Sequence, residues 1–485
     1  MMKLSVVTVV LLAVRHHGVQ ALPFGPWLDS AAHYFGHLFH RQSFVAFDIF
    51  LDRVRNSTFG DFSSTAVVDE VSFTEMKQRI LAIYGGVNVT NVTSFVLDGE
   101  YCDCIQLMQQ PSVHLLGLDH IEAPPSFVPP DRFGDGGAEA TNISLPAPSV
   151  LDLGLRDPFG NPVSCPDNTV PIQRLTLESV SRFSTLRDFD WKPPVHLLNA
   201  DGSVLVPRGV DDARADRVEK RLDPNKPIHL HAFAWESKTN YGLNSWIDLW
   251  SPNTDLSFSQ QWVLGNVSGS LLQTVEGGWV VYKKRWGSKA RLFTIYTADD
   301  YGKLSCYNHD CGTFTQTNSH WYLGGPWDRY SIYGGQQWGF EMQWQLYQGN
   351  WWLLLRGPGA FEPVGYYPGK VFNGGPLTRS ATDVVFGGEV ANISSKPAYH
   401  HGPMGSGHFA EEGWTRAAYQ NRIFRVIRSS SGENIGVWAA LKPILQTWLN
   451  CYTMAVTPWQ QGGTWGTYMY FGGPGGDNCW NGQGP

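Results

Sequence analysis

The sequence predicts an all-β chain, an antiparallel β-sandwich of jelly-roll-like type, preceded by a smaller domain of mixed structure. Composition is the first observation: 16% of the residues are charged and 13% are aromatic, with 52 glycines and 30 prolines. Such a composition is typical of sheets broken by turns and unlike that of a helical bundle. At 485 residues the chain is longer than one compact core usually is, so we expect two domains.

The clearest strand pattern runs from Trp338 to Tyr347, where large apolar residues alternate strictly with Gln, Gly or Glu. This period of two predicts a strand with one buried face and one face in water. Residues 348–350 have turn composition and residues 351–355 form a second run, which together predict a β-hairpin. Similar short runs follow one another after residue 227 without helices between them, so we expect antiparallel pairing.

The N-terminus has the pattern of a signal peptide over residues 1–21. Lys3 precedes an apolar run from Leu4 to Val14, which is too short to span a bilayer, and Val19-Gln20-Ala21 fits a cleavage site. We therefore expect a secreted, extracellular protein with no membrane segment in its mature form. Six glycosylation triplets agree with secretion, at Asn56, Asn88, Asn91, Asn142, Asn266 and Asn392. The net charge of −7, without a Lys/Arg block, gives no support to nucleic-acid binding.

Charge concentrates suddenly at residues 211–226, which we interpret as the boundary between two domains. The pair Lys220-Arg221 within this segment predicts a dibasic processing site. Upstream, residues 124–148 are rich in proline and glycine and predict a loop or linker, and Val71 to Tyr84 predicts an amphipathic helix.

Seven cysteines in an oxidising compartment should mostly be paired, with one thiol left over. The expected pairs are Cys306 with Cys311, Cys451 with Cys479, and Cys165 with either Cys104 or Cys102. There is no CxxC pair and no histidine cluster beside the cysteines, so we expect no zinc site.

A series of short motifs runs in one order from about residue 98 to the C-terminus. The motifs include Asp103-Cys104, Gln110-Pro111, Cys165 to Ile172, Glu276-Gly277-Gly278-Trp279, Tyr333 to Gln337, Asn350-Trp351-Trp352, Gly387-Gly388-Glu389 and Met404 to Phe409. Together they resemble the neprosin family of secreted glutamic peptidases. The chain departs from the family pattern in its long segment at residues 22–95, in the extra Cys102, and at Gly277 and Phe386, where Ala and Trp are common.

The resemblance implies a zymogen with a signal peptide at 1–21, a propeptide at 22–221 and a peptidase domain at 222–485. The propeptide, with an activation-peptide-like core at about 96–180 and a linker to 221, would inhibit the enzyme. The substrates would be proline-containing proteins or peptides, cut on the carboxyl side of proline at acid pH without a cofactor or metal. With Cys104 as the expected family cysteine, we predict Cys104–Cys165, Cys306–Cys311 and Cys451–Cys479 disulfides and a free Cys102.

Glu276 and Glu389 stand at the positions of the family's two catalytic glutamates. Two carboxyl groups that share a site repel each other, so their pKa values separate; one can take a proton from water while the other donates one. Glycine pairs flank both residues and would let a substrate backbone approach the sheet. The sequence leaves open which glutamate is the base.

Other residues offer a choice between a binding role and a structural one. The candidates for substrate binding are Trp279, Gln336, Gln337, Trp351 and Trp352. The tryptophans could stack on proline or belong to the core, and the glutamines could bind substrate or shape a turn. The histidines His229, His231, His400 and His401 lack a metal-ligand spacing, and His408 lacks the serine elbow of a triad, so we interpret it as structural.

Two other functions remain open at this point. Paired carboxylates and many tryptophans also suit a glycan-binding or glycoside-hydrolysing β-sandwich. A binding or wall-associated module could also keep this fold without the chemistry.

Overall fold

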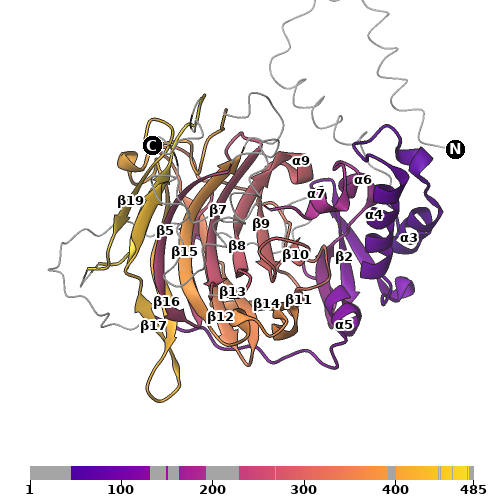
Figure 1. The fold of residues 1–485 in the computed structure, drawn as a ribbon, viewed down its shortest axis with the longest axis horizontal. Coiled ribbons are helices and arrows are strands. Elements are labelled where there is room, and N and C mark those ends of the chain that lie inside the picture. Colours follow the sequence, from indigo (N-terminus) through magenta and orange to yellow (C-terminus); the bar gives the residue numbers. More distant parts are fainter. Residues whose placement is uncertain are drawn as a thin grey trace, which may run out of the picture. The chain divides into compact units, whose positions relative to one another are not determined.

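The computed structural model describes residues 45–130, 149–150, 163–192, 229–391 and 400–479, except positions 268, 446, 448, 461–462 and 478. Within it, Ala46–Pro485 form one compact unit (Figure 1). The predicted signal peptide, the processing site Lys220-Arg221, and the acceptors Asn142 and Asn392 lie outside the described residues.

The N-terminal part of this unit is mixed, as predicted. Helices α3 (Phe47–Asn56) and α4 (Glu70–Ile83) precede a small antiparallel sheet of β1 (Thr93–Leu97), β2 (Glu100–Gln106) and β4 (Thr169–Gln173). Asp69 caps α4, because its Oδ1 accepts a hydrogen bond of 2.7 Å from the Ser72 backbone N–H. This helix is the one that the sequence predicts at Val71 to Tyr84.

Short helical turns complete this part. They are η1 (Phe59–Phe62), η2 (Val89–Asn91), η3 (Leu107–Gln109), α5 (Pro111–Leu116), α6 (Leu177–Val180) and α7 (Leu186–Asp190). Among the described residues, none of the helices combines the length and the apolar character that crossing a bilayer requires.

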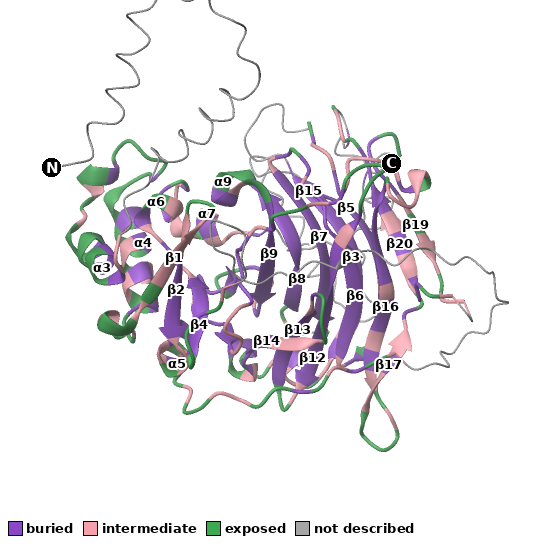
Figure 2. Cartoon of the chain, turned by 180° about the vertical axis from the view of Figure 1, so that it is seen from behind, coloured by how far each residue is buried: buried purple, intermediate pink, exposed green. Residues whose placement is uncertain are grey.

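The rest of the unit is an antiparallel β-sandwich, as the sequence predicts. Its first sheet contains, in order, β10 (Ser305–Tyr307), β9 (Gly287–Thr297), β8 (Gln273–Tyr282), β7 (Leu256–Gly265), β15 (Ala381–Ala391), β5 (His229–Asn240) and β18 (Lys442–Leu445). All six neighbouring pairs run antiparallel. Strands β7 and β8 are buried along their whole length (Figure 2).

The second sheet follows the order β11 (Thr315–Gln316), β14 (Glu362–Tyr367), β13 (Asn350–Arg356), β12 (Trp338–Tyr347), β6 (Gly242–Asp248), β16 (Ala418–Arg428), β20 (Tyr468–Gly472) and β19 (Thr453–Thr457). Two further strands join it, β17 (Asn434–Trp438) beside β16 and β3 (Ser149–Val150) parallel to β12. The connecting turns include α9 (Lys283–Trp286), η4 (Gly369–Phe372), η5 (Pro376–Thr378) and η6 (Ala410–Glu412).

Large side chains from both sheets fill the space between them. The core includes Val263, Val275, Trp279 and Leu292 from the first sheet and Phe340, Met342, Trp344 and Leu353 from the second. Complete burial of one such apolar side chain stabilises the fold by about 1.5–3 kcal/mol. One face of the first sheet is therefore buried against the second sheet.

The predicted hairpin exists, but its polar face is not in water. β12 pairs with β13 through the turn at 348–349, whereas Glu341, Gln343 and Gln345 are almost fully buried. The chain at Val128 covers this face, and the Gln343 amide exchanges two hydrogen bonds with the Val128 backbone at 2.9 and 3.0 Å. Alternation thus predicts the orientation of each residue correctly, but not which segment packs on the second face.

The described cysteines form the three expected disulfides. Cys104 is bonded to Cys165 in the N-terminal part, whereas Cys306–Cys311 and Cys451–Cys479 lie in the sandwich. Cys102 is free and buried, and burial raises its pKa well above the usual value. The extra cysteine is therefore held as a protonated thiol inside the small sheet.

Candidate functional site

The two candidate glutamates come from strands that are separated by one strand. Glu276 on β8 lies opposite Trp262 of β7, and Glu389 on β15 lies opposite Phe258 of the same strand. Phe258 and Trp262 are four residues apart on one strand, so their side chains point to the same face of the sheet. Both glutamates therefore lie on this face, and their side chains are at most 1% exposed.

The glycines beside the glutamates are required by the sheet itself. Gly278 and Gly387 have φ of 155° and 151°, values that favour glycine. A Cβ atom would lie 2.1 Å from the Ser259 carbonyl oxygen at the first position and 2.3 Å from that of Ala232 at the second. The room expected for a substrate backbone is occupied at these two positions by neighbouring strands.

A single lysine from the N-terminal part joins the two carboxyl groups. Lys192 Nζ contacts Glu276 Oε2 directly, lies 3.6 Å from Glu389 Oε2 and donates to Gln260 Oε1 at 3.2 Å. The same nitrogen lies 5.1 Å from the ring centre of Phe258. Its side chain is 1% exposed. The Lys192 side chain therefore lies between the two carboxyl groups and contacts both.

Hydroxyl groups surround the Glu276 carboxyl on its other side. Thr274 Oγ1 donates to Glu276 Oε1 at 2.8 Å, and the Tyr301 hydroxyl donates to the same oxygen. Burial and the nearby Glu276 charge raise the pKa of Tyr301 well above its usual value. Tyr301 therefore keeps its proton and remains a donor.

Nitrogen donors surround Glu389. His229 Nδ1 lies 2.6 Å from Glu389 Oε1, and Gln260 Nε2 donates to Oε2 at 2.7 Å. His231 Nε2 lies 3.7 Å from Oε2. Burial alone would raise the pKa of this carboxyl, but Lys192, His231 and His229 outweigh burial and hold the pKa well below the usual range. Glu389 is therefore ionised in this arrangement.

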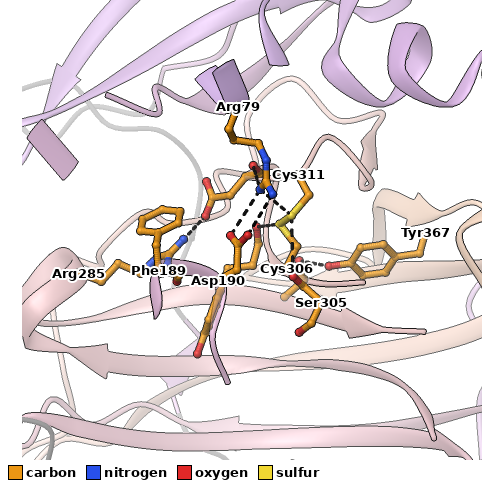
Figure 3. Close-up of a disulfide and its surroundings, with 11 residues drawn as sticks. Arg79, Phe189, Asp190, Arg285, Ser305, Cys306, Cys311 and Tyr367 are labelled. Atoms are coloured by element: carbon orange, nitrogen blue, oxygen red, sulfur yellow. Dashed lines mark hydrogen bonds and ion pairs between the residues drawn. A yellow bond between two sulfur atoms is a disulfide. The ribbon is translucent and has the colours of Figure 1, made fainter. Parts of the chain in front are cut away.

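The helical turn that ends just before Lys192 is anchored next to the Cys306–Cys311 disulfide (Figure 3). Arg79 of α4 forms an ion pair of 3.1 Å with Asp190 and donates to Cys311 Sγ at 3.1 Å. Burial raises the pKa of Asp190 to about 6, although Arg79 lowers it. Asp190 therefore remains ionised at neutral pH, and α7 is held on the sandwich.

Arg285 of α9 makes a second anchor for the same turn (Figure 3). Its Nη1 donates to the Phe189 carbonyl oxygen at 2.5 Å, and the Phe189 ring lies 3.7 Å from its Cζ atom. Its Nη2 is paired with Asp310, in the loop that the disulfide closes. Asp190, Cys306 and Cys311 are also close enough together to suggest metal ligands, but both sulfurs belong to the disulfide.

Two of the proposed substrate-binding tryptophans are in the core. The rings of Trp279 and Trp351 are fully buried between the sheets, and they donate to the carbonyl oxygens of Asp248 and Leu377. Neither ring is available to stack on a proline.

The remaining candidates lie in the second sheet or in a turn. Trp352 is fully buried against Tyr366, with a distance of 4.5 Å between ring centres. Gln337 is buried and its side chain donates to the carbonyl oxygens of Ile332 and Gly335, which is the turn role considered for it. Gln336 is exposed. The structure therefore does not bring these residues to the glutamates.

The sequence did not single out the residues that contact the two glutamates. Lys192, Gln260 and Tyr301 belong to no recognisable sequence motif. Folding of the chain brings them to the two glutamates. The histidines did carry a signal: His229 and His231 are two residues apart in a strand pattern, which places both on one face. This signal is a shared strand face and not a metal-ligand spacing.

Comparisons with solved structures give weak likenesses. Scytalido-glutamic peptidase with a transition state analog inhibitor is 9% identical, with 51% of this chain and 98% of that chain covered and a TM-score of 0.27. SCP-B, a member of the Eqolisin family of peptidases, is 8% identical. The match covers 51% of this chain and 98% of that chain, with a TM-score of 0.25. CG-16, a homodimeric agglutinin from chicken liver, is 6% identical. The match covers 35% of this chain and 97% of that chain, with a TM-score of 0.17. At these TM-scores the likenesses carry no functional conclusion.

A family model gives the decisive comparison. The model described as Neprosin matches residues 253–474, a range that contains both Glu276 and Glu389 and most of the sandwich. This match supports a peptidase that acts on protein or peptide substrates. Residues 253–474 therefore form a Neprosin domain.

Proposed function

We propose that the chain is the zymogen of a secreted glutamic endopeptidase that cuts on the carboxyl side of proline at acid pH. The observation that carries the proposal is that one ammonium group, Lys192 Nζ, lies within 3.6 Å of both Glu276 and Glu389. Two carboxyl groups that reach one atom can also reach one water molecule and one peptide bond. The preference for proline rests on the resemblance to the neprosin motifs.

The chemistry follows from two carboxyl groups with different protonation. The ionised group takes a proton from water as the water oxygen attacks the peptide carbonyl, and the protonated group donates to the carbonyl oxygen. Gln260 lies beside Glu389 and Lys192, so its amide is placed to bind substrate once the lysine has left.

The same geometry supports inhibition by the propeptide. Lys192 precedes the predicted processing site Lys220-Arg221, so it belongs to the part that processing would remove. The anchors at Arg79 and Arg285 hold the residues just before it on the sandwich. We define residues 186–192 as the latch: a turn that inserts one lysine between the proposed catalytic groups.

Glycosylation fits the described surface. Asn56, Asn88 and Asn91 are exposed and Asn266 is half-buried, so the first three are accessible to a glycosyltransferase. Together with the predicted signal peptide, these positions support secretion.

We expect the latch to open only at strongly acid pH. The pKa of Glu389 is depressed, so the stability it contributes is present above its ordinary pKa of about 4.5 and is lost as pH falls through its lower value in the folded protein. The pKa of Asp190 is raised to about 6, so its protonation on acidification favours the folded latch. Intact-mass time courses across a pH series should show no conversion near pH 5. Rapid conversion there would contradict this account.

The proposed activity is tested with two substrates. The acid-treated protein should cleave a peptide that contains one proline and leave a β-glucan intact, with products read by mass spectrometry. A peptide in which alanine replaces proline is the matched control, and it should be cleaved much more slowly. Release of oligosaccharides without peptide cleavage would favour the glycoside-hydrolase alternative.

Self-processing is tested with Glu389→Gln. If the enzyme removes its own propeptide, this variant should stay at full length after acidification while the unchanged protein is shortened. If the secreted variant already begins at Leu222, a host convertase cuts after Lys220-Arg221 instead.

A further inference from the structure

The two glutamates have neighbours of different kinds, and this difference remains when Lys192 is gone. Glu276 contacts the hydroxyl groups of Thr274 and Tyr301, and a hydroxyl group can accept a hydrogen bond as well as donate one. Such neighbours tolerate a protonated Glu276. The Gln260 amide nitrogen and the His229 Nδ1–H at Glu389 can only donate. They favour an ionised Glu389.

His229 is the closest of the neighbours of Glu389. The distance of 2.6 Å between Nδ1 and Oε1 is short, and the two side chains are 5% and 1% exposed. An ionised carboxylate only accepts hydrogen bonds, so Nδ1 carries the proton. Hydrogen bonds of this kind to a charged acceptor are about twice as strong as neutral ones.

The strand pairing keeps His229 in place after processing. β5 begins at His229 and pairs with β15, with Ala391 opposite His229 and Glu389 opposite His231. Both histidines follow the predicted processing site and so remain in the mature enzyme. Lys192 and Trp191, whose ring packs against His229 at 5.5 Å, precede it.

We propose that His229 is a positioning residue that keeps Glu389 ionised in the mature enzyme, which makes Glu389 the base and Glu276 the acid. The proposal rests on the peptidase function proposed above. In the precursor Lys192 provides the positive charge next to both carboxylates, and after its removal His229, supported by His231, provides the charge at Glu389 alone.

The protonation of His229 depends on the groups that face it. These are Glu389 from β15, His231 from its own strand and Lys192 from the latch. Burial, followed by His231 and Lys192, lowers the pKa of His229 in the precursor, while Glu389 raises it. Removal of the latch takes away part of the burial and one positive charge. Both losses favour the charged form of the imidazole in the mature enzyme.

Each proton in the reaction is accounted for with these roles. Glu389 takes a proton from water as the water oxygen bonds to the carbonyl carbon, and Glu276 gives its proton to the carbonyl oxygen. On collapse, one hydroxyl of the intermediate returns a proton to Glu276 and Glu389 passes its proton to the leaving nitrogen. The C–N bond then breaks, and the pair again holds one proton.

The first test is the pH profile of the activated enzyme. In His229→Ala the acid limb of kcat/KM should move upward by about one pH unit or more, because Glu389 loses the charge that keeps it ionised. We expect kcat at low pH to fall about tenfold or more with little change in KM. His229→Gln can donate the hydrogen bond without the charge and should restore part of kcat without restoring the acid limb.

A matched control and a second readout complete the experiment. His400 is exposed and paired with Asp477, so His400→Ala should keep the unchanged profile. Infrared difference spectra should show the protonated Glu389 band, identified by its loss in Glu389→Gln, at higher pH in His229→Ala. An unshifted band would overturn the proposal even if the protein cleaved no peptide, whereas a shifted band in an inactive protein would overturn only the peptidase function.

Discussion

Replacing either glutamate by glutamine should abolish peptide cleavage. The amide is nearly isosteric with the carboxyl group but cannot exchange a proton, so Glu276→Gln and Glu389→Gln should each lose general acid–base catalysis, worth about 10²–10⁴-fold per group. Initial rates on a proline-containing peptide at acid pH give the measurement.

Circular dichroism should show that these two variants keep the fold, although each precursor should melt at a lower temperature because a buried ion pair with Lys192 is lost. Glu341→Gln is the matched control, since this buried glutamate pairs with Arg356 and Arg422 on the second sheet, away from Lys192. The control should keep its activity if it folds. Substantial turnover by Glu276→Gln or Glu389→Gln would remove that glutamate from the mechanism.

Lys192→Met should produce a precursor that no longer holds its site closed. Removal of one partner from a buried ion pair costs about 3–5 kcal/mol, because the remaining charges lose their compensation. This cost falls on the closed form, so the ratio of closed to open molecules should drop by about 10²–10⁴-fold. The uncleaved precursor should therefore cleave peptides without a previous acid step, as an assay combined with intact-mass measurement would show.

Lys303→Met provides the comparison for this variant, because Lys303 is exposed on the same chain. Lys192→Arg keeps the charge and should stay largely closed. If Lys192→Met has normal stability and remains as silent as the unchanged precursor, the latch does not work through this lysine.

The fold could be predicted from the sequence where the signal is local. The hairpin of β12 and β13 follows from alternation and a turn, and α4 from helical spacing. The polar face of β12 could not be predicted as buried, because Val128 reaches it from more than two hundred positions away in the chain. Periodicity shows which residues share a face, but it does not show what covers that face.

The residues of the candidate site also differ in whether the sequence could reveal them. Glu276 and Glu389 could be named because their glycine-flanked motifs match a family, while two of the tryptophan candidates, Trp279 and Trp351, turned out to be core residues. Lys192 could not be found from sequence, since an isolated lysine usually lies on the surface. The anchors at Arg79 and Arg285 hold the preceding residues on the sandwich, and the pairing with both glutamates compensates the buried charge.

The positions of the disulfides bear on how the proposed inhibitory segment would leave. Cys104–Cys165 lies wholly before the predicted cut, and Cys306–Cys311 and Cys451–Cys479 lie wholly after it, so none of the disulfides in the described residues bridges the two pieces. Before the cut, the latch and the site that it occupies belong to one chain. Their effective concentration is then about millimolar, and it does not depend on the concentration of the protein. After the cut, the same contacts join two separate molecules, and their association weakens on dilution. For the secreted zymogen proposed above, spreading into a larger volume would then be an activating step in its own right.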